Sequence, residues 1–224
     1  MKNYETILFD LDGTLTDPKE GIIKSIEYAL RKMGLIEMEE SELLPFIGPP
    51  IQQSFSEVCG MNKNEVARAV HFYREYFTEN GMIENKVYSG IPQLLNELKE
   101  AGKKLFVATS KPTVFAKEIL KFFQLDHYFI EIVGSNLDGT RINKKEIIEW
   151  ICQKYLQFSD GEVVMVGDRS HDIIGANLNG IESIGVMYGY GTKEELEQVN
   201  ASYVVGTVEE LRTILRIEST VKIL

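Results

Sequence analysis

The 224-residue chain is poor in residues that crosslink or bind soft metals, with two cysteines and three histidines. Cys59 and Cys152 lie far apart and form no Cys-x-x-Cys pair, which excludes a disulfide framework and a thiolate metal site. No stretch approaches the ~18 apolar residues that a membrane span needs, and the apolar run at residues 7–9 is too short for a signal-peptide core. We therefore expect a cytoplasmic protein with no membrane partner.

Basic residues are also scarce, because 24 Lys and Arg stand against 34 Asp and Glu, a net charge of −10. With no local basic stripe, this charge repels polyphosphate backbones and excludes a nucleic-acid polymer as the main partner. Apolar residues make up 44% of the chain, which is enough for a core. The length exceeds the usual ~100–150 residues of one domain, so we expect one large domain or a core with a smaller insert.

Six short apolar runs predict strands of a parallel sheet. They cover residues 6–9, 105–108, 163–166 and 183–186, with weaker patterns at 130–133 and 203–205. Continuous apolar runs are typical of strands that are buried on both faces. Helical patterns at residues 92–101 and 113–123, and two capping boxes near the C-terminus, alternate with these runs. The alternation predicts an α/β fold with a doubly wound, Rossmann-like core.

Residues 16–85 contain helical patterns and no convincing strand. Asp17, Pro18 and Glu20 predict the start of one helix, and a helical pair is expected at residues 51–59 and 65–78. We expect residues 16–85 to form an all-helical cap domain inserted into a core of residues 1–15 and 86–224. An insert at this position would lie above the carboxyl ends of the strands, where open α/β folds bind ligands.

Acidic residues follow two of the predicted strands. Asp10 and Asp12 stand in an Asp-x-Asp-Gly-Thr sequence after the first strand, and Asp168 and Asp172 follow the strand at 163–166. Each could instead end a turn or cap a helix. If the strand ends meet, two carboxylates ~4 Å apart repel by ~4 kcal/mol at an effective dielectric of 20, so the cluster should recruit a cation. Oxygen ligands without Cys or a His pair favour Mg²⁺.

A phosphate cradle is indicated by polar residues at two further positions. Thr109, Ser110 and Lys111 follow the strand at 105–108, and Lys144 opens a helix. A hydroxyl, backbone amides at a helix N-terminus and an ammonium group together bind phosphate. Taken singly, Thr109 is equally explained as a helix cap and Lys144 as a surface lysine, so the combination carries the hypothesis.

In chain order, the Asp10 to Thr14 segment, Thr109, Lys144 and the Asp168 to Asp172 segment resemble the motifs of the haloacid dehalogenase superfamily. The aspartate at position 12 resembles the residue that the phosphatase and phosphomutase branch of the family has at this place. The sequences at 46–50, 108–112, 167–169 and 184–191 resemble the phosphoglycolate phosphatase and 5′-nucleotidase-like subgroup. The helical insert is similar to the small cap that this family places between its first and second motifs.

The resemblance implies a phosphatase that acts on small phosphorylated metabolites. Asp10 would attack phosphorus and become an aspartyl phosphate, while Asp12 would protonate the leaving oxygen and then deprotonate the hydrolytic water. Thr109, Ser110 and Lys144 would bind the phosphoryl oxygens and neutralise charge in the transition state.

The same resemblance implies Mg²⁺ as the cofactor. Its ligands would be the carboxylates of Asp10 and Asp168 and the main-chain carbonyl of Asp12, with Asp172 behind them orienting a metal-bound water or Lys144. We expect the cap to close over this site and to exclude large substrates.

Substrate identity is left open between phosphoglycolate and nucleoside monophosphates. Candidate substrate contacts are Gly48, Pro49 and Gln52 in the insert, and Lys111 and Arg169 beside the motif residues. The Gly-Pro-Pro sequence could equally be a turn between helices, and the two cations could face solvent.

Three alternatives remain beside the phosphatase. A phosphomutase of the same family, like β-phosphoglucomutase, would need a cap that holds a sugar bisphosphate and excludes water. A receiver module also clusters carboxylates, a threonine and a lysine, although the inserted cap points away from it. A non-catalytic phospho-accepting or binding module would keep the fold alone. We expect a monomer or a weak homodimer.

Overall fold

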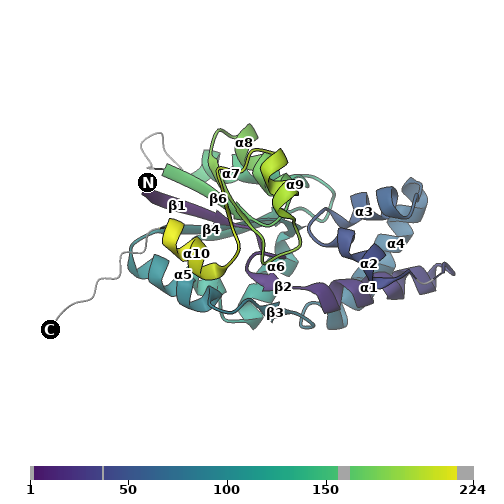
Figure 1. The fold of residues 1–224 in the computed structure, drawn as a ribbon. Coiled ribbons are helices and arrows are strands. Elements are labelled where there is room, and N and C mark those ends of the chain that lie inside the picture. The colour runs from purple at the N-terminus through teal and green to yellow at the C-terminus, as the bar shows by residue number, and fades with distance from the viewer. Residues whose placement is uncertain (1–2, 37, 156–161, 216–224) are drawn as a thin grey trace.

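The computed structural model describes residues 3–36, 38–155 and 162–215. In this part of the chain, six parallel strands form one sheet in the order β5-β4-β1-β6-β7-β8 (Figure 1). The strands are β1 (Tyr4–Phe9), β4 (Lys104–Pro112), β5 (Glu131–Ser135), β6 (Glu162–Gly167), β7 (Glu182–Val186) and β8 (Tyr203–Val205). The predicted α/β fold with a doubly wound parallel sheet is confirmed.

Helices cover both faces of the sheet. Leu8 and Met165 point to one face and pack with α7 (Lys144–Tyr155) and α8 (Ser170–Leu178). Ile7 and Phe9 point to the other face, where α5 (Ile91–Glu100), α6 (Thr113–Phe122) and α10 (Val208–Ile214) contribute to the buried cluster. The alternation follows from the two-residue period of a strand. A further helix, α9 (Lys193–Gln198), packs beside α8 and β8.

The strand register brings three strand ends together. Phe9, the last residue of β1, pairs with Val107 of β4 on one side and with Val166 of β6 on the other. The chain extends from β1 through β4 to β5, then returns to β6 and extends through β7 to β8. In such a sheet, ligands bind at the carboxyl ends of the strands where the two directions diverge, which is here beside β1.

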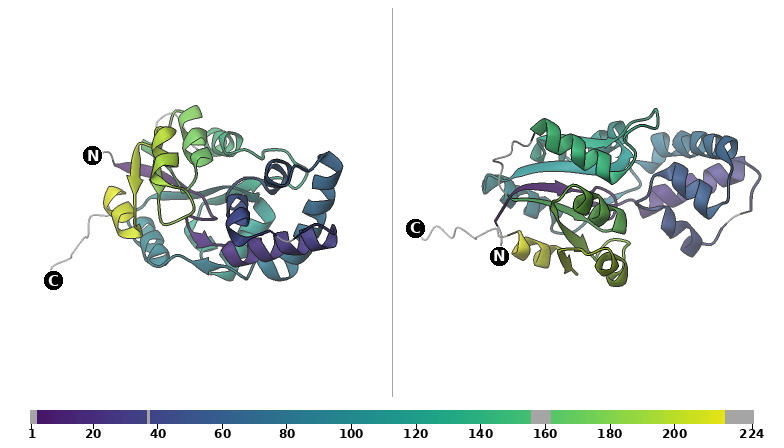
Figure 2. Two further views of the ribbon diagram at one scale, coloured as in Figure 1. Left: turned by 45° about the vertical axis from the view of Figure 1, so that its right-hand side comes forward. Right: turned by 90° about the horizontal axis from the view of Figure 1, so that it is seen from above.

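The segment between β2 (Thr16–Asp17) and β3 (Lys86–Val87) is helical. It contains α1 (Lys19–Lys32), α2 (Glu40–Leu43), the 3₁₀ turn η1 (Leu44–Phe46), α3 (Ile51–Val58), α4 (Lys63–Tyr76) and the π-helical turn η2 (Phe77–Gly81). These helices lie beyond the carboxyl ends of the strands, away from the N-terminus (Figures 1 and 2). We propose that they form the cap domain, residues 16–85, inserted into a core of residues 1–15 and 86–224.

Two short strands at the junction were not predicted. β2 pairs antiparallel with β3 through Thr16 with Val87 and Asp17 with Lys86. Strands of two residues carry no periodic pattern, so the sequence predicted only helices at residues 16–85. The pair joins the outgoing and returning chains side by side at the base of the helical segment.

The helix starts differ from the predicted ones by one or two residues. α1 begins at Lys19, whose N–H donates to Asp17 Oδ1 at 3.1 Å, so Pro18 takes the cap position instead of the first helical position. α4 begins at Lys63 because Asn62 caps it in a reciprocal pair with Glu65, a signal that the sequence analysis missed.

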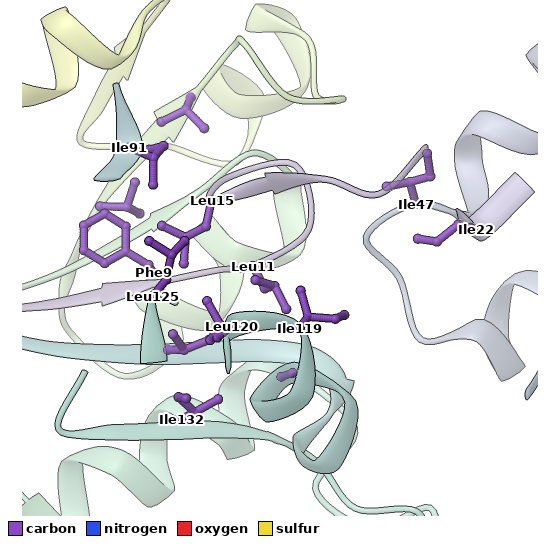
Figure 3. Packing of buried hydrophobic residues seen from close by; sticks show 14 of the residues in the cluster. Phe9, Leu11, Leu15, Ile22, Ile47, Ile91, Ile119, Leu120, Leu125 and Ile132 are labelled. Carbon is purple, nitrogen blue, oxygen red and sulfur yellow. The ribbon is translucent and has the colours of Figure 1, made fainter. Parts of the chain in front are cut away.

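One buried apolar cluster extends from the sheet into the helical segment. In Figure 3, Phe9, Leu11 and Leu15 lie with residues of α6, while Ile22 and Ile47 pack together on the side of the insert. Both cysteines are free thiols. Among the residues that the structure describes, no helix combines the length and hydropathy needed to cross a bilayer.

We predict that Gly21→Ala destabilises the protein by roughly 1–3 kcal/mol, as overpacking does in a dense interior. A Cβ at Gly21 of α1 would lie 2.0 Å from the carbonyl oxygen of Gly81, which is backbone and cannot swing away. Urea unfolding of both proteins checks this. The matched control is Gly206→Ala, where the nearest atoms to a new Cβ lie at 3.5 Å. Equal midpoints for Gly21→Ala and wild type would contradict the prediction.

Candidate active site

Three buried carboxylates meet where β1 and β6 end. Asp10 follows β1, Asp168 follows β6, and Asp172 lies in the first turn of α8. One oxygen from each lies within 4.8 Å of the others. The register of β1 on β6 explains this convergence, because Asp10 and Gly167 stand at equivalent positions on neighbouring strands. The predicted meeting of the strand ends is therefore confirmed.

A single ammonium group neutralises part of this charge. Lys144, the first residue of α7, is 2% exposed, so the surface-lysine alternative is wrong. Its Nζ lies 2.8 Å from Asp10 Oδ1 and 2.8 Å from Asp172 Oδ1, and donates to the Ala108 carbonyl at 2.7 Å. Burial acts to lower the pKa of Lys144, but the two carboxylates outweigh it and raise the pKa. The lysine therefore stays charged in the interior.

The two carboxylate oxygens of Asp10 differ in their hydrogen-bond partners. Oδ1 accepts the Leu11 N–H at 2.7 Å and faces Lys144, while no donor among the described residues lies within hydrogen-bond distance of Oδ2. Burial raises the pKa of Asp10 to about 6; the charges of Asp172 and Asp12 act in the same direction, and Lys144 opposes them. One oxygen of Asp10 therefore has no protein donor among the residues that the structure describes.

Asp168 keeps an unsatisfied oxygen in the interior. Its Oδ2 accepts the Tyr190 N–H at 2.8 Å, whereas Oδ1 is buried and has no donor among the described residues. Burial, followed by the charges of Asp172 and Asp10, raises the pKa of Asp168 well above its usual value. An orphaned carboxylate oxygen beside two others fits a divalent cation, and an all-oxygen donor set fits Mg²⁺.

Asp172 lies behind these ligands and contacts Lys144. Burial alone would raise the pKa of Asp172, but Lys144 and His171 hold it below its usual value. Its Oδ2 also accepts the Arg169 N–H at 3.1 Å. Of the two roles expected for Asp172, orientation of Lys144 is the one for which the structure provides a contact.

Asp12 is paired with a lysine from the next strand. Lys111 Nζ lies 2.7 Å from Asp12 Oδ2 and 4.6 Å from the centre of the Phe77 ring. Both charged side chains are buried, with 6% and 10% exposed for Lys111 and Asp12. Lys111 therefore does not face solvent, and its partner is the expected acid.

The predicted phosphate-binding residues of β4 are buried at the same edge of the sheet. Thr109 Oγ1 accepts the Lys111 N–H at 3.3 Å, and the Ser110 carbonyl accepts the Ser135 hydroxyl at 2.8 Å. Thr109 thus shapes the end of β4 and does not cap α6, whose cap position is Pro112. Their contact with a phosphoryl group stays a prediction.

A cavity of about 50 Å³ separates the insert from the core at this edge. Gly48, Pro49 and Gln52 line it from the insert, and Asp12 and Lys111 line it from the core. The Gly-Pro-Pro sequence forms a turn between η1 and α3, as the alternative interpretation predicted, and its contact with substrate stays a prediction. A substrate in this cavity would contact both parts of the chain.

Arg169 connects the insert to the core instead of lining the cavity. Its Nη1 donates to the Ile47 carbonyl at 2.7 Å, and its Nε donates to Glu195 Oε1 at 3.1 Å. Glu195 also accepts the Ser170 N–H at 2.8 Å, so it does not complete the capping box predicted with Thr192. The expected contact of Arg169 with substrate stays a prediction.

Close backbone packing around Asp168 was missed by the sequence analysis. A Cβ at Gly189 would lie 2.3 Å from the Gly13 carbonyl, and one at Gly191 would lie 1.9 Å from the Asp168 carbonyl. A Cβ at Gly13 itself would lie 2.1 Å from Asp168 Oδ2. The alternating Tyr-Gly-Tyr-Gly sequence at residues 188–191 is the signal that could have identified this loop.

The arrangement is that of a known enzyme family. Residues 7–186 match the model of the haloacid dehalogenase-like hydrolases. The chain therefore belongs to the haloacid dehalogenase-like hydrolase family, which confirms both the resemblance and the expectation of an enzyme.

Several relatives that match most of the chain carry the names of phosphatases or kinases. A protein of Pseudomonas aeruginosa named 5′-nucleotidase is 45% identical over 95% of this chain and 96% of its own. A predicted phosphatase of Clostridium acetobutylicum, solved by crystallography, is 47% identical, with a TM-score of 0.91 over 95% of this chain and 98% of that one. Tyrosine-protein kinase PtkA of Mycobacterium tuberculosis is 34% identical over 94% of this chain and 72% of its own.

We predict that Arg169→Ala loosens the loop around Ile47 without unfolding the protein. A hydrogen bond from a charged donor is worth roughly 1.5–3 kcal/mol, so amide hydrogen exchange at residues 46–48 should accelerate by about tenfold or more. Lys193→Ala, which removes an exposed ion pair with Glu197 on the neighbouring α9, is the control. Unchanged exchange at residues 46–48 in Arg169→Ala would show that the contact does not hold the loop.

Proposed function

We propose that this protein is a Mg²⁺-dependent phosphatase that hydrolyses small phosphomonoesters through an aspartyl-phosphate intermediate. The observation that carries the proposal is Asp10, whose Oδ1 is held by the Leu11 N–H and Lys144 while Oδ2 is free at the carboxyl edge of the sheet. Family membership and the names of the relatives support a phosphatase of the 5′-nucleotidase or phosphoglycolate phosphatase type.

The first step is attack on phosphorus. Asp10 Oδ2 forms a bond to phosphorus as the bond from phosphorus to the ester oxygen breaks, and the leaving alcohol takes a proton from Asp12. Thr109, Ser110 and Lys144 stabilise the negative charge of the transferring group. Phosphate-ester hydrolysis needs accelerations of up to ~10²¹-fold, so acid catalysis worth ~10²–10⁴-fold must be combined with a nucleophile and fixed positive charge.

The second step releases phosphate. Asp12, now ionised, accepts a proton from a water molecule that attacks the aspartyl phosphate, and Asp10 is regenerated. The 2.7 Å contact with Lys111 supports this role, because it holds the Asp12 carboxylate at the cavity that both residues line.

Mg²⁺ would be held by the carboxylates of Asp10 and Asp168 and the main-chain carbonyl of Asp12. When bound, it supplies positive charge beside the transferring phosphoryl group. The orphaned Oδ1 of Asp168 supports its presence, since a buried anionic oxygen with no donor is otherwise costly.

The named alternatives predict different products. A phosphomutase would need a sugar bisphosphate for turnover, a receiver would hold its phosphoryl group for many minutes, and a binding module would release no phosphate. Transfer from ATP to a tyrosyl peptide, the activity that the name of the mycobacterial relative describes, serves as a control reaction in the same assay.

We predict that Asp10→Asn lowers the kcat for phosphate release by roughly 10³-fold or more, the scale of losing a covalent nucleophile. The measurement is release of inorganic phosphate from a panel of small esters, with circular dichroism to verify folding. Asp126→Asn, which changes an exposed carboxylate in the 3₁₀ turn η3 (Asp126–Tyr128), is the control. Near wild-type turnover in Asp10→Asn would rule out the covalent mechanism.

We predict that Mg²⁺ raises the melting temperature of EDTA-treated protein and that Asp168→Asn abolishes this rise. At 100 times its Kd a ligand adds ~2.7 kcal/mol, which corresponds to roughly 5–10 °C for a chain of this size. Without metal, Asp168→Asn should be no less stable than wild type, because it removes a buried and partly unsatisfied charge. A full Mg²⁺ response in this variant would exclude Asp168 as a ligand.

A further inference from the structure

Arg74 of α4 lines the cavity that contains Asp12, yet it has no acidic partner. Among the described residues, no carboxylate or carbonyl oxygen lies within hydrogen-bond distance of its guanidinium. Its main-chain carbonyl accepts the Thr78 hydroxyl at 2.8 Å, which leaves the side chain unpaired within the described chain. The side chain is half-buried, and burial lowers the pKa of Arg74. An arginine in such surroundings usually has a bound anion or a carboxylate beside it.

The charges that line the cavity do not cancel. Asp12, Lys111 and Arg74 are the charged residues of its lining, and Asp12 and Lys111 lie 2.7 Å apart as an ion pair. Arg74 is therefore the excess positive charge, and it enters from the insert, whereas the residues proposed to hold the transferring phosphoryl group enter from the core. A ligand that spans the cavity from Asp12 would meet Arg74 with its leaving-group end.

The space beside Asp12 and Arg74 is small. One water needs roughly 10–15 Å³ of such space, so about 50 Å³ holds roughly four waters. The cavity therefore favours a compact leaving group, whereas a nucleoside, with its ring base and ribose, would extend beyond it.

We propose that Arg74 determines specificity by binding a second anionic group, so that the preferred substrates are compact phosphomonoesters whose leaving group carries a carboxylate or a phosphoryl group. The guanidinium presents paired N–H donors that match the geometry of both anions. The inference rests on the proposed phosphatase function and names its substrate class.

The experiment compares kcat/KM for charged and neutral esters of similar size. 2-Phosphoglycolate carries the carboxylate, pyrophosphate carries the second phosphoryl group, ethyl phosphate is the neutral counterpart, and a nucleoside 5′-monophosphate represents a large leaving group. The variants are Arg74→Gln and Arg74→Lys. Arg68→Gln, which changes an exposed arginine on the same helix, is the matched control.

We expect Arg74→Gln to lower kcat/KM for 2-phosphoglycolate, pyrophosphate or both by about 10–100-fold, the scale of a lost charged hydrogen bond. Ethyl phosphate should change less than threefold, Arg74→Lys should recover part of the loss, and Arg68→Gln should change nothing. The anion that shows the larger loss identifies the group that Arg74 binds.

Two results would overturn the inference while leaving the phosphatase intact. One is an equal loss on ethyl phosphate and on both anionic esters in Arg74→Gln. The other is a wild-type preference for the nucleoside monophosphate over both anionic esters that Arg74→Gln does not alter. Failure of the wild-type enzyme to release phosphate from any of the four compounds would instead refute the proposed function, and the inference with it.

Discussion

The crowding of four carboxylates around two lysines at the end of β1 is the constraint on which the rest of the structure depends. Lys144 lies between Asp10 and Asp172, and Lys111 pairs with Asp12. Each like-charge pair at ~4 Å costs ~4 kcal/mol at an effective dielectric of 20, so no arrangement without these cations would be stable in the interior. The two lysines neutralise only part of this charge, and Asp168 is the carboxylate that neither of them contacts; its Oδ1 has no donor in the described chain.

The same crowding explains why glycines stand at several positions around the carboxylates. Gly13 in one backbone segment, and Gly189 and Gly191 in a second, let the chain approach Asp168 to distances that a Cβ would occupy. A Cβ at Gly167 would lie 2.3 Å from the Asp172 carboxyl carbon, and one at Gly175 would lie 2.9 Å from the Lys144 side chain. Backbone therefore replaces water around the carboxylates, which lowers the local dielectric and strengthens the ion pairs that hold the site.

The sequence predicted the core of the site because strand ends and register are encoded locally. Asp10 and Asp168 follow apolar runs, and parallel strands bring their carboxyl ends to one edge, so the cluster could be derived without coordinates. The Arg169 contact with Ile47, the Lys111 contact with Phe77 and the place of Arg74 in the cavity lining could not. Each depends on how far the helical insert tilts toward the sheet, and no spacing along the chain encodes that angle. The β2 and β3 strands were missed for a related reason, since two residues carry no period.

The residues proposed for chemistry and those proposed for substrate selection come from different parts of the chain. The groups proposed for chemistry come from the ends of β1, β4 and β6, whose relative positions are set by backbone hydrogen bonds across the sheet and tolerate little change. The groups proposed to select the size and charge of the leaving group come from the insert, which meets the core through the Arg169 contact with Ile47 and through apolar packing. Substitutions in the insert can therefore alter which leaving group is accepted without displacing Asp10. An insert that can change while the strand-end residues stay fixed is compatible with relatives that share this fold and bear different names.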